Sequence, residues 1–327
     1  VWVNADEIPG NNIDDDGNGF VDDVHGYNFA HDTGYMIDDD GHGTHVAGII
    51  LGVGQDIFTS PFDQAKIRIM PLKFLDGSGM GTTSDAIDAI YYAVNNGAKV
   101  LNNSWGGPSY SGALHEAIVY SYSKGVAFVA ASGNSSSNND AAPMYPASYT
   151  VPNVISVAAT TDLDYLASFS NFGFSSVDVG SPGVFILSSI PGGGYGTMSG
   201  TSMATPFVSG IAALMLVESP NMLGYQMRQI IFEQSDNTVH LTNKVVTQSR
   251  VNVTDSVNAA KNATVDLTQP YYSFTNQDRQ LASALAGGGC GLVSKMYKDM
   301  SGNGKGGPTS GAPGTWYIII VLGLLSL

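Results

Sequence analysis

The chain has 327 residues, of which 43% are hydrophobic and 13% are charged. Such a chain can bury a large core, and its length predicts one large domain plus an appendage. The formal net charge of −15 argues against nucleic-acid binding, which needs basic patches, whereas it suits the binding of calcium. Cys290 is the only cysteine, so an internal disulfide is excluded and cysteine usage does not indicate a compartment.

An acidic segment near the N-terminus has the spacing of a calcium-binding loop. Residues 14–23 carry five carboxylates, and Asp14, Asp16 and Asn18 fall at the first, third and fifth positions of an EF-hand-like loop. His25 stands where such a loop has its bidentate glutamate, so another carboxylate would have to close the shell. We predict a structural Ca²⁺ site here, with a solvated acidic turn as the alternative. The expected ligands are Asp14, Asp16, Asn18, the Phe20 carbonyl and, to close the shell, Asp22 and Asp23.

Downstream of this segment, short apolar runs alternate with helical patterns. The predicted strands cover residues 67–72, 100–105, 126–130 and 154–158. The predicted helices begin at Ser84, with Ser84 or Thr83 as the cap, span 113–124, and run from Ser202 through Met215. This alternation indicates an α/β fold with a parallel sheet covered on both faces. A functional site is expected at the carboxyl ends of the strands.

Three short motifs bring together the residue types of nucleophilic catalysis. Gly-Thr-Ser at 200–202 places a serine at the mouth of a helix, where free N–H groups and the helix dipole favour negative charge. A serine hydroxyl needs a base to act as a nucleophile, and Gly-His-Gly-Thr-His at 41–45 supplies an imidazole between glycines. Ala-Ser-Gly-Asn at 131–134 follows a predicted strand. Taken singly, such motifs are more often a helix cap, a structural histidine and a turn.

Together these motifs resemble those of the subtilisin-like serine proteases, the subtilases, over about the first four fifths of the chain. The resemblance implies a three-layer α/β fold, with a mostly parallel sheet and helices on both faces. It also implies a serine endopeptidase that cleaves peptide bonds through an acyl-enzyme. His42 would be the general base, Ser202 the nucleophile and Asn134 a side-chain donor to the oxyanion, while His45 is interpreted as structural.

The same resemblance implies two walls and a second edge for an extended peptide substrate. Backbone pairing of this kind gives affinity with little side-chain selection. The expected substrate-binding residues are Ser104, Trp105 and Gly106 on one side, Ala131, Ser132 and Gly133 opposite, and Ser78 and Gly79 on the second edge. Ordinary glycine-rich loops are the alternative interpretation of these segments.

The acid of the family's catalytic triad has no match in this chain. In the family it ends an apolar strand upstream of the histidine motif, and this chain begins with a segment that resembles the one just after that strand. Asp-Thr-Gly at 32–34 matches the residues of the family's Asp-Ser/Thr-Gly motif. It does not follow an aliphatic strand, so we interpret it as a loop. The simplest interpretation is a fragment without the acid and without one central strand. Loss of the acid costs about 10⁴-fold in turnover, so little activity is expected of the chain as given.

Two further expectations concern partners. The resemblance implies an autoinhibitory propeptide that this chain does not contain. The alternative to a protease is a catalytically inactive, calcium-stabilised surface protein that binds peptides in the same groove, although retention of all three catalytic side chains argues against it.

The C-terminal part differs in composition from the rest. We expect a catalytic domain over 1–264, a Gly/Ser/Pro-rich linker over 265–314 and an apolar tail over 315–327. The tail is shorter than the roughly 20 apolar residues of a spanning helix. A GPI-anchor signal, a truncated membrane helix and a buried terminal strand all remain open, and we favour a membrane tether on a secreted or cell-surface protein.

Overall fold

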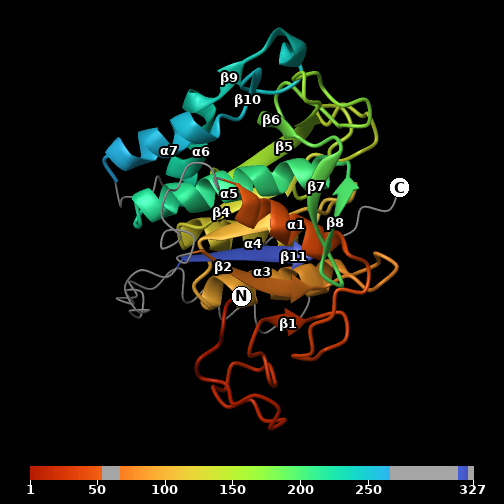
Figure 1. Cartoon of the computed structure of the whole chain (residues 1–327), viewed down its shortest axis with the longest axis vertical. Helices are drawn as coiled ribbons and strands as arrows, with labels where there is room; N and C mark the ends of the chain where they lie inside the picture. The colour runs from red at the N-terminus through yellow and green to blue at the C-terminus, as the bar shows by residue number, and fades with distance from the viewer. Residues whose placement is uncertain (54–66, 266–315, 323–327) are drawn as a thin grey trace.

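The computed structural model describes residues 1–53, 67–265 and 316–322, the last as backbone only. Its centre is a nine-stranded sheet in the order β1-β2-β11-β3-β4-β5-β6-β10-β9 (Figure 1). All neighbouring strands run parallel except β10 and β9. The strands are β1 Tyr27–Asn28, β2 Ile67–Lys73, β3 Val100–Asn103, β4 Ala127–Ala131, β5 Val154–Thr160, β6 Val179–Pro182, β9 Asp236–Asn237, β10 Ser249–Arg250 and β11 Trp316–Leu322.

Helices cover both faces of this sheet, so the predicted three-layer α/β class is confirmed. One face carries α1 His42–Gly52, α5 Thr201–Glu218, α6 Gly224–Gln234 and α7 Val253–Asn262. The other carries α3 Thr83–Asn95 and α4 Gly112–Ser123. A separate antiparallel hairpin consists of β7 Ile186–Ile190 and β8 Gly194–Met198, and a short 3-10 helix spans Val239–Leu241. Buried apolar side chains fill the space on each side of the sheet.

The four predicted strands appear as β2, β3, β4 and β5, with ends that shift by one or two residues. The predicted helices appear as α3, α4 and α5. The cap of α3 was wrong: Thr82, and not Ser84 or Thr83, accepts a side-chain hydrogen bond from the Asp85 N–H. The short strands β1, β6, β9 and β10, the hairpin, α6 and α7 were not predicted, because each is short or carries a weak apolar pattern.

The C-terminal apolar segment lies in the middle of the sheet. β11 pairs in parallel with β2 from Trp316 to Leu322 and with β3 from Ile318 to Val321 (Figure 1). It therefore fills the central gap that the sequence led us to expect. Of the three alternatives for the tail, residues 316–322 take that of a strand, which lies between β2 and β3, whereas we had favoured the membrane tether. The predicted linker, apart from its first residue, lies outside the described residues.

In the described part of the chain, α5 is the one helix long and apolar enough to cross a membrane by composition. It runs through the protein core, because 83% of its 18-residue window is buried inside the fold. An apolar surface on all sides suits a helix that packs against the sheet, α1 and α7 at once. The helix that begins at the Gly-Thr-Ser motif is thus a rigid core element.

Candidate active site

Three chain segments carry the predicted catalytic residues to the edge of the sheet where parallel strands end. His42 is the first residue of α1, Ser202 is the second of α5, and Asn134 comes three residues after β4. α1 packs directly against α5. Parallel α/β sheets have their binding sites at this edge, outside the carboxyl ends of the strands.

Ser202 is buried at the N-terminus of α5, with 4% of its surface exposed. Its backbone carbonyl accepts a hydrogen bond of 2.9 Å from the Ser104 hydroxyl, and its own hydroxyl donates a long one of 3.4 Å to the Ser104 carbonyl. Ser104 comes directly after β3. The serine is therefore fixed by two elements, its own helix and the neighbouring strand.

Asn134 is oriented by the residue before that serine. Its side-chain oxygen accepts hydrogen bonds from the Thr201 N–H and from the Thr201 hydroxyl, both at 2.9 Å. The amide nitrogen Nδ2 is left for another partner. Both this nitrogen and the Ser202 backbone nitrogen lie 3.6 Å from the point that a Cβ on Gly200 would occupy. Both nitrogens therefore border the same space beside Gly200.

Gly133 holds the loop that carries Asn134. Its φ of +110° is unfavourable for any side chain, and an added Cβ would lie 2.6 Å from Nδ2 of Asn171. The Asn171 carboxamide oxygen in turn accepts hydrogen bonds from the backbone of Ser135 at 2.8 Å and Ser137 at 3.0 Å. The sequence did not point to Asn171, since no motif marks it and it lies far along the chain.

The imidazole of His42 is buried and unpaired. Its exposed fraction is 8%, and neither ring nitrogen has a hydrogen-bond partner among the described residues. Burial lowers the pKa of His42 to about 4, although the nearby carboxylates of Asp40 and Asp38 oppose the shift. The ring is therefore neutral at pH 7, and it makes no hydrogen bond to Ser202 in this structure.

The start of α1 is fixed by a run of aspartates that no sequence motif had singled out. Asp38 accepts hydrogen bonds from the Gly41 N–H at 2.8 Å and from the Thr44 N–H at 2.7 Å. Asp39 forms an ion pair of 2.5 Å with Lys73, whose side chain is 5% exposed at the end of β2. These contacts set the position of His42, which comes directly after the aspartates and a glycine.

The positions of His45 and of Asp-Thr-Gly at 32–34 agree with their interpretation as a structural histidine and a loop. His45 is fully buried, and its Nε2 lies 3.1 Å from the carbonyl oxygen of Gly196 in β8. Asp-Thr-Gly at 32–34 lies in a turn, where Asp32 accepts a 2.7 Å hydrogen bond from the Tyr27 hydroxyl. Neither group is paired with the imidazole of His42.

Two of the three segments expected to bind substrate contact the start of α5, through Ser104 and Gly133. Trp105 comes directly after Ser104, and a Cβ on Gly106 would lie 3.0 Å from the Tyr145 carbonyl, so this wall is tightly packed. Ala131 ends β4, and the Ser132 hydroxyl donates a 3.1 Å hydrogen bond to the Asn171 carbonyl on the opposite wall. On the second edge, Ser78 and Gly79 lie in a turn held by Asp76, which accepts from the Ser78 N–H at 2.8 Å.

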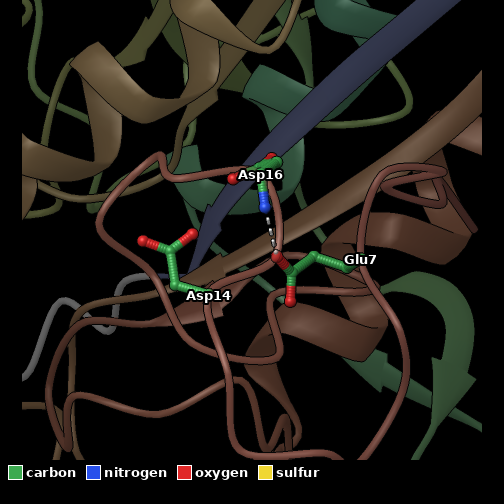
Figure 2. Close-up of side chains that lie close together, drawn as sticks. All are labelled: Glu7, Asp14 and Asp16. Atoms are coloured by element: carbon green, nitrogen blue, oxygen red, sulfur yellow. Dashed lines mark hydrogen bonds between the residues drawn. The ribbon is translucent and has the colours of Figure 1, made fainter.

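The acidic segment brings together only part of the predicted ligand set. Asp14 and Asp16 lie beside Glu7, a residue that the loop spacing did not indicate (Figure 2). Asp22 instead accepts hydrogen bonds from the backbone of residues 10–12, and Asp23 accepts them from Asn4, Asn18 and Tyr92. No motif could have indicated Glu7, because it precedes the loop by seven residues.

These features define the class of the protein. A buried serine at a helix N-terminus, two N–H donors beside it and a neutral histidine on an adjacent helix, all at the carboxyl edge of a parallel sheet, are the arrangement of a serine hydrolase. The profile of the subtilase family matches residues 7–269. The chain belongs to this family.

The chain is similar to several named proteases and to a solved structure of the same family. A thermophilic serine proteinase of Bacillus sp. (strain AK1) is 40% identical over 234 residues, which are 72% of this chain and 56% of the relative. Thermitase of Thermoactinomyces vulgaris is 41% identical over 192 residues, 59% of this chain and 67% of thermitase. The crystal structure of a cold adapted subtilisin-like serine proteinase matches with a TM-score of 0.58 and 37% identity, over 70% of this chain and 79% of the other. The chain thus spans little more than half the length of the Bacillus proteinase.

Proposed function

We propose that the protein is a serine endopeptidase and that Ser202, His42 and Asn134 are its reacting and stabilising groups. The observation that carries this proposal is that the Asn134 Nδ2 and the Ser202 backbone nitrogen both lie 3.6 Å from one point beside Gly200. Donors aimed at one point next to a serine hydroxyl stabilise the oxyanion of a tetrahedral intermediate, an effect worth about 10²–10³-fold per donor. A helix cap or a turn does not need both donors.

The proposed reaction proceeds through an acyl-enzyme. Neutral His42 takes the proton of the Ser202 hydroxyl, and the Ser202 oxygen attacks the carbonyl carbon of the scissile peptide bond. The two N–H donors hold the oxyanion, and His42 gives the proton to the leaving amine as the C–N bond breaks. His42 then takes a proton from water, which attacks the acyl carbon, and returns that proton to the Ser202 oxygen as the acid product is released.

The described residues supply no carboxylate to the His42 ring, and β11, the strand between β2 and β3, contains no acidic residue. This observation favours the second candidate function, a catalytically inactive binding protein with the same fold. We rank it below the protease because a binding groove requires neither a buried serine nor two oxyanion donors. Activity of the chain as given is expected to be low for the same reason.

The expected partners are those that membership of the subtilase family implies. We propose that an extended peptide or protein substrate pairs with the backbone at Ser104–Gly106 and is held from the other edge by Ser78 and Gly79. Secretion or attachment at the cell surface and control by an autoinhibitory propeptide are part of this proposal. One relative, 40% identical over 65% of this chain and 23% of its own length, is a cell wall-associated protease of Bacillus subtilis (strain 168), which supports the extracellular setting.

We also propose that the acidic segment binds a structural Ca²⁺ ion. Support comes from the hard carboxylate oxygens that Asp14 and Asp16 bring close to Glu7, since such oxygens are the ligands that Ca²⁺ prefers. The ion would stabilise the fold and take no part in peptide hydrolysis.

The proposed function is tested with Ser202→Ala in the whole chain. Hydrolysis of a chromogenic peptide substrate is expected to fall by at least about 10²-fold, because triad members act as a unit and the His42 ring has no acid here. Ser135→Ala, an exposed serine beside Asn134, is the matched control and is expected to leave the rate unchanged. Hydrolysis by Ser202→Ala at the rate of the unaltered chain would contradict the proposal.

A further inference from the structure

Four Asn-X-Ser/Thr sequons, the acceptor motif for N-linked glycans in secreted proteins, occur in the sequence. They begin at Asn102, Asn134, Asn252 and Asn262, and the structure describes all of them. An N-linked glycan is bulky and hydrophilic, so a folded protein can carry it only on an asparagine whose side-chain nitrogen Nδ2 is open to solvent. The surroundings of the four asparagines therefore decide which of them can be modified.

Two of the sequons are closed by the groups around them. Asn102 in β3 is fully buried, its Nδ2 donates a 3.0 Å hydrogen bond to the Ser104 hydroxyl, and its oxygen accepts one of 2.8 Å from Ser209. The oxygen of Asn134 accepts hydrogen bonds from the N–H and the hydroxyl of Thr201, both at 2.9 Å. A glycan on either asparagine would displace packed groups, so this fold is incompatible with a sugar at both sites.

The third sequon begins at the residue that caps α7. The side-chain oxygen of Asn252 accepts a 3.0 Å hydrogen bond from the Asp255 N–H, an N-cap contact. Its Nδ2 donates to the two carboxylate oxygens of Asp236 in β9, at 3.1 and 3.2 Å, and to Asp255 at 2.9 Å. Glycosylation replaces one of the two hydrogens on Nδ2, so it would break contacts that join the start of α7 to β9.

The fourth sequon is open to solvent. Asn262 is the last residue of α7 and is exposed, whereas the buried residues of this helix lie nearer its start. Its Nδ2 donates a 3.0 Å hydrogen bond to the Asn258 carbonyl, and the one hydrogen that glycosylation leaves on Nδ2 can keep this contact. Ala263 is extended, with φ −72° and ψ 137°, and Thr264 is exposed. The whole sequon therefore projects from the end of the helix.

Asn262 also lies far from the candidate active site. The Nζ of its neighbour Lys261 is 4.0 Å from Oε2 of Glu218, the last residue of α5. Ser202 is the second residue of this 18-residue helix. At about 1.5 Å per residue, about 24 Å of helix separate Ser202 from Glu218. Figure 1 shows α7 at the end of α5 that is farther from β7 and β8. A glycan on Asn262 would thus leave the space beside Ser202 open.

We propose that Asn262 is an N-glycosylation site. This inference goes beyond peptide hydrolysis and rests only on the secretion proposed above. The glycan donor is a lipid-linked oligosaccharide pyrophosphate. A bond forms between the Asn262 Nδ2 and the anomeric carbon of the sugar, and the bond from this carbon to the pyrophosphate oxygen breaks. The lipid pyrophosphate leaves with the electron pair, and the amide gives up one proton.

The test directs the whole chain into the secretory pathway of a eukaryotic cell by an added signal peptide. Peptide N-glycosidase, which converts a glycosylated asparagine to aspartate, is applied to the recovered folded protein, and peptide mapping by mass spectrometry locates the change. We expect one glycan, on Asn262. Thr264→Ala keeps the asparagine but removes its sequon, so the glycan is expected to disappear. Thr254→Ala removes the sequon at Asn252 and keeps the helix cap, and as the matched control it is expected to retain the glycan.

An unmodified Asn262 would overturn the inference, and so would a glycan that persists in Thr264→Ala. If Thr264→Ala does not fold, Asn262→Gln repeats the test. Glycosylated and enzymatically deglycosylated protein are expected to hydrolyse a peptide substrate at the same rate, because the sugar lies far from Ser202. Absence of hydrolysis in both forms, with a glycan on Asn262, would contradict the proposed protease function and leave the modification site established.

Discussion

Around Ser202 the polar groups are held by hydrogen bonds from two other elements, whereas the ring of His42 is buried with neither nitrogen paired. On the oxyanion side, Thr201 orients Asn134, and Ser104 fixes both the backbone and the hydroxyl of Ser202. On the base side, Asp38 and Asp40 fix the backbone at the start of α1. No described group orients the imidazole.

The difference between Ser202 and His42 shows which side chains are positioned by neighbouring segments and which need a group from elsewhere in the chain. Asn134 follows β4, and Ser202 lies at the start of α5, which packs on β3, β4 and β5, so their contacts arise from the packing of this helix on the sheet. The ring of His42 depends on a group from a further segment, and β11 does not contribute one. The chain therefore combines a serine and an asparagine that are held by hydrogen bonds with a histidine ring that has no described partner.

The largest effect is expected on the oxyanion side, from Asn134→Asp. Aspartate keeps the oxygen that accepts from Thr201 but removes the N–H donor, so hydrolysis of a peptide substrate should fall by about 10²–10³-fold. The rate is measured at pH 7 with the melting temperature as the control for folding. A decrease below tenfold with an unchanged melting temperature would mean that Asn134 does not contact the oxyanion.

On the base side, the expected effect is a dependence of stability on pH. The folded pKa of His42 is about 4 against an ordinary value of 6.5, so between these values the unfolded chain binds the extra proton. Stability from the neutral ring is complete above pH 6.5 and is lost as the pH falls, by about 3 kcal/mol at pH 4.

Urea unfolding at pH 7 and near pH 4 measures this loss. His42→Gln cannot titrate, so its stability is expected to fall less over the same range, and the difference between the two chains isolates the ring. An equal fall in both would show that His42 titrates near its ordinary pKa. That outcome would indicate a carboxylate partner for the ring, and the contrast between the two sides would disappear.

A smaller effect is expected at the loop that carries Asn134. Gly133→Ala forces a side chain into a φ of +110° and against Asn171, which should cost about 1–3 kcal/mol of unfolding free energy and lower the hydrolysis rate. Gly97→Ala is the matched control, because Gly97 has a φ of +81° with nothing within 4 Å of an added Cβ. Equal losses of stability, with no loss of activity in Gly133→Ala, would contradict the proposed role of the loop.

The sequence predicted those parts of the fold that have a clear local residue pattern. The buried strands β2 to β5 and the helix after Gly-Thr-Ser have continuous apolar character, and the three side chains proposed as catalytic were identified from short motifs. The place of β11 could not be predicted. A short apolar run suits a central strand as well as part of a membrane helix, and its pairing with β2 joins segments about 250 residues apart.

In the candidate sites too, local spacing identified some residues and missed others. Loop spacing pointed to Asp14 and Asp16, but Glu7 joins them only through the path of the folded backbone. Spacing also assigned Asp22 and Asp23 to the ion, and in the fold both accept hydrogen bonds from other groups, as Asp14 and Asp16 do. Asn171 supports the Asn134 loop from more than 30 residues away and carries no motif. Interactions between distant segments are the information that a local pattern lacks.

The proposed role of Ser202 is that of a nucleophile beside a preformed oxyanion site. Its most direct test is incubation of the whole chain with a fluorophosphonate, with peptide mapping of the product by mass spectrometry. We predict an adduct on the peptide that contains Ser202, formed slowly because the base is unassisted, and no adduct in Ser202→Ala. Absence of an adduct on Ser202, or equal labelling of the alanine variant, would contradict this role.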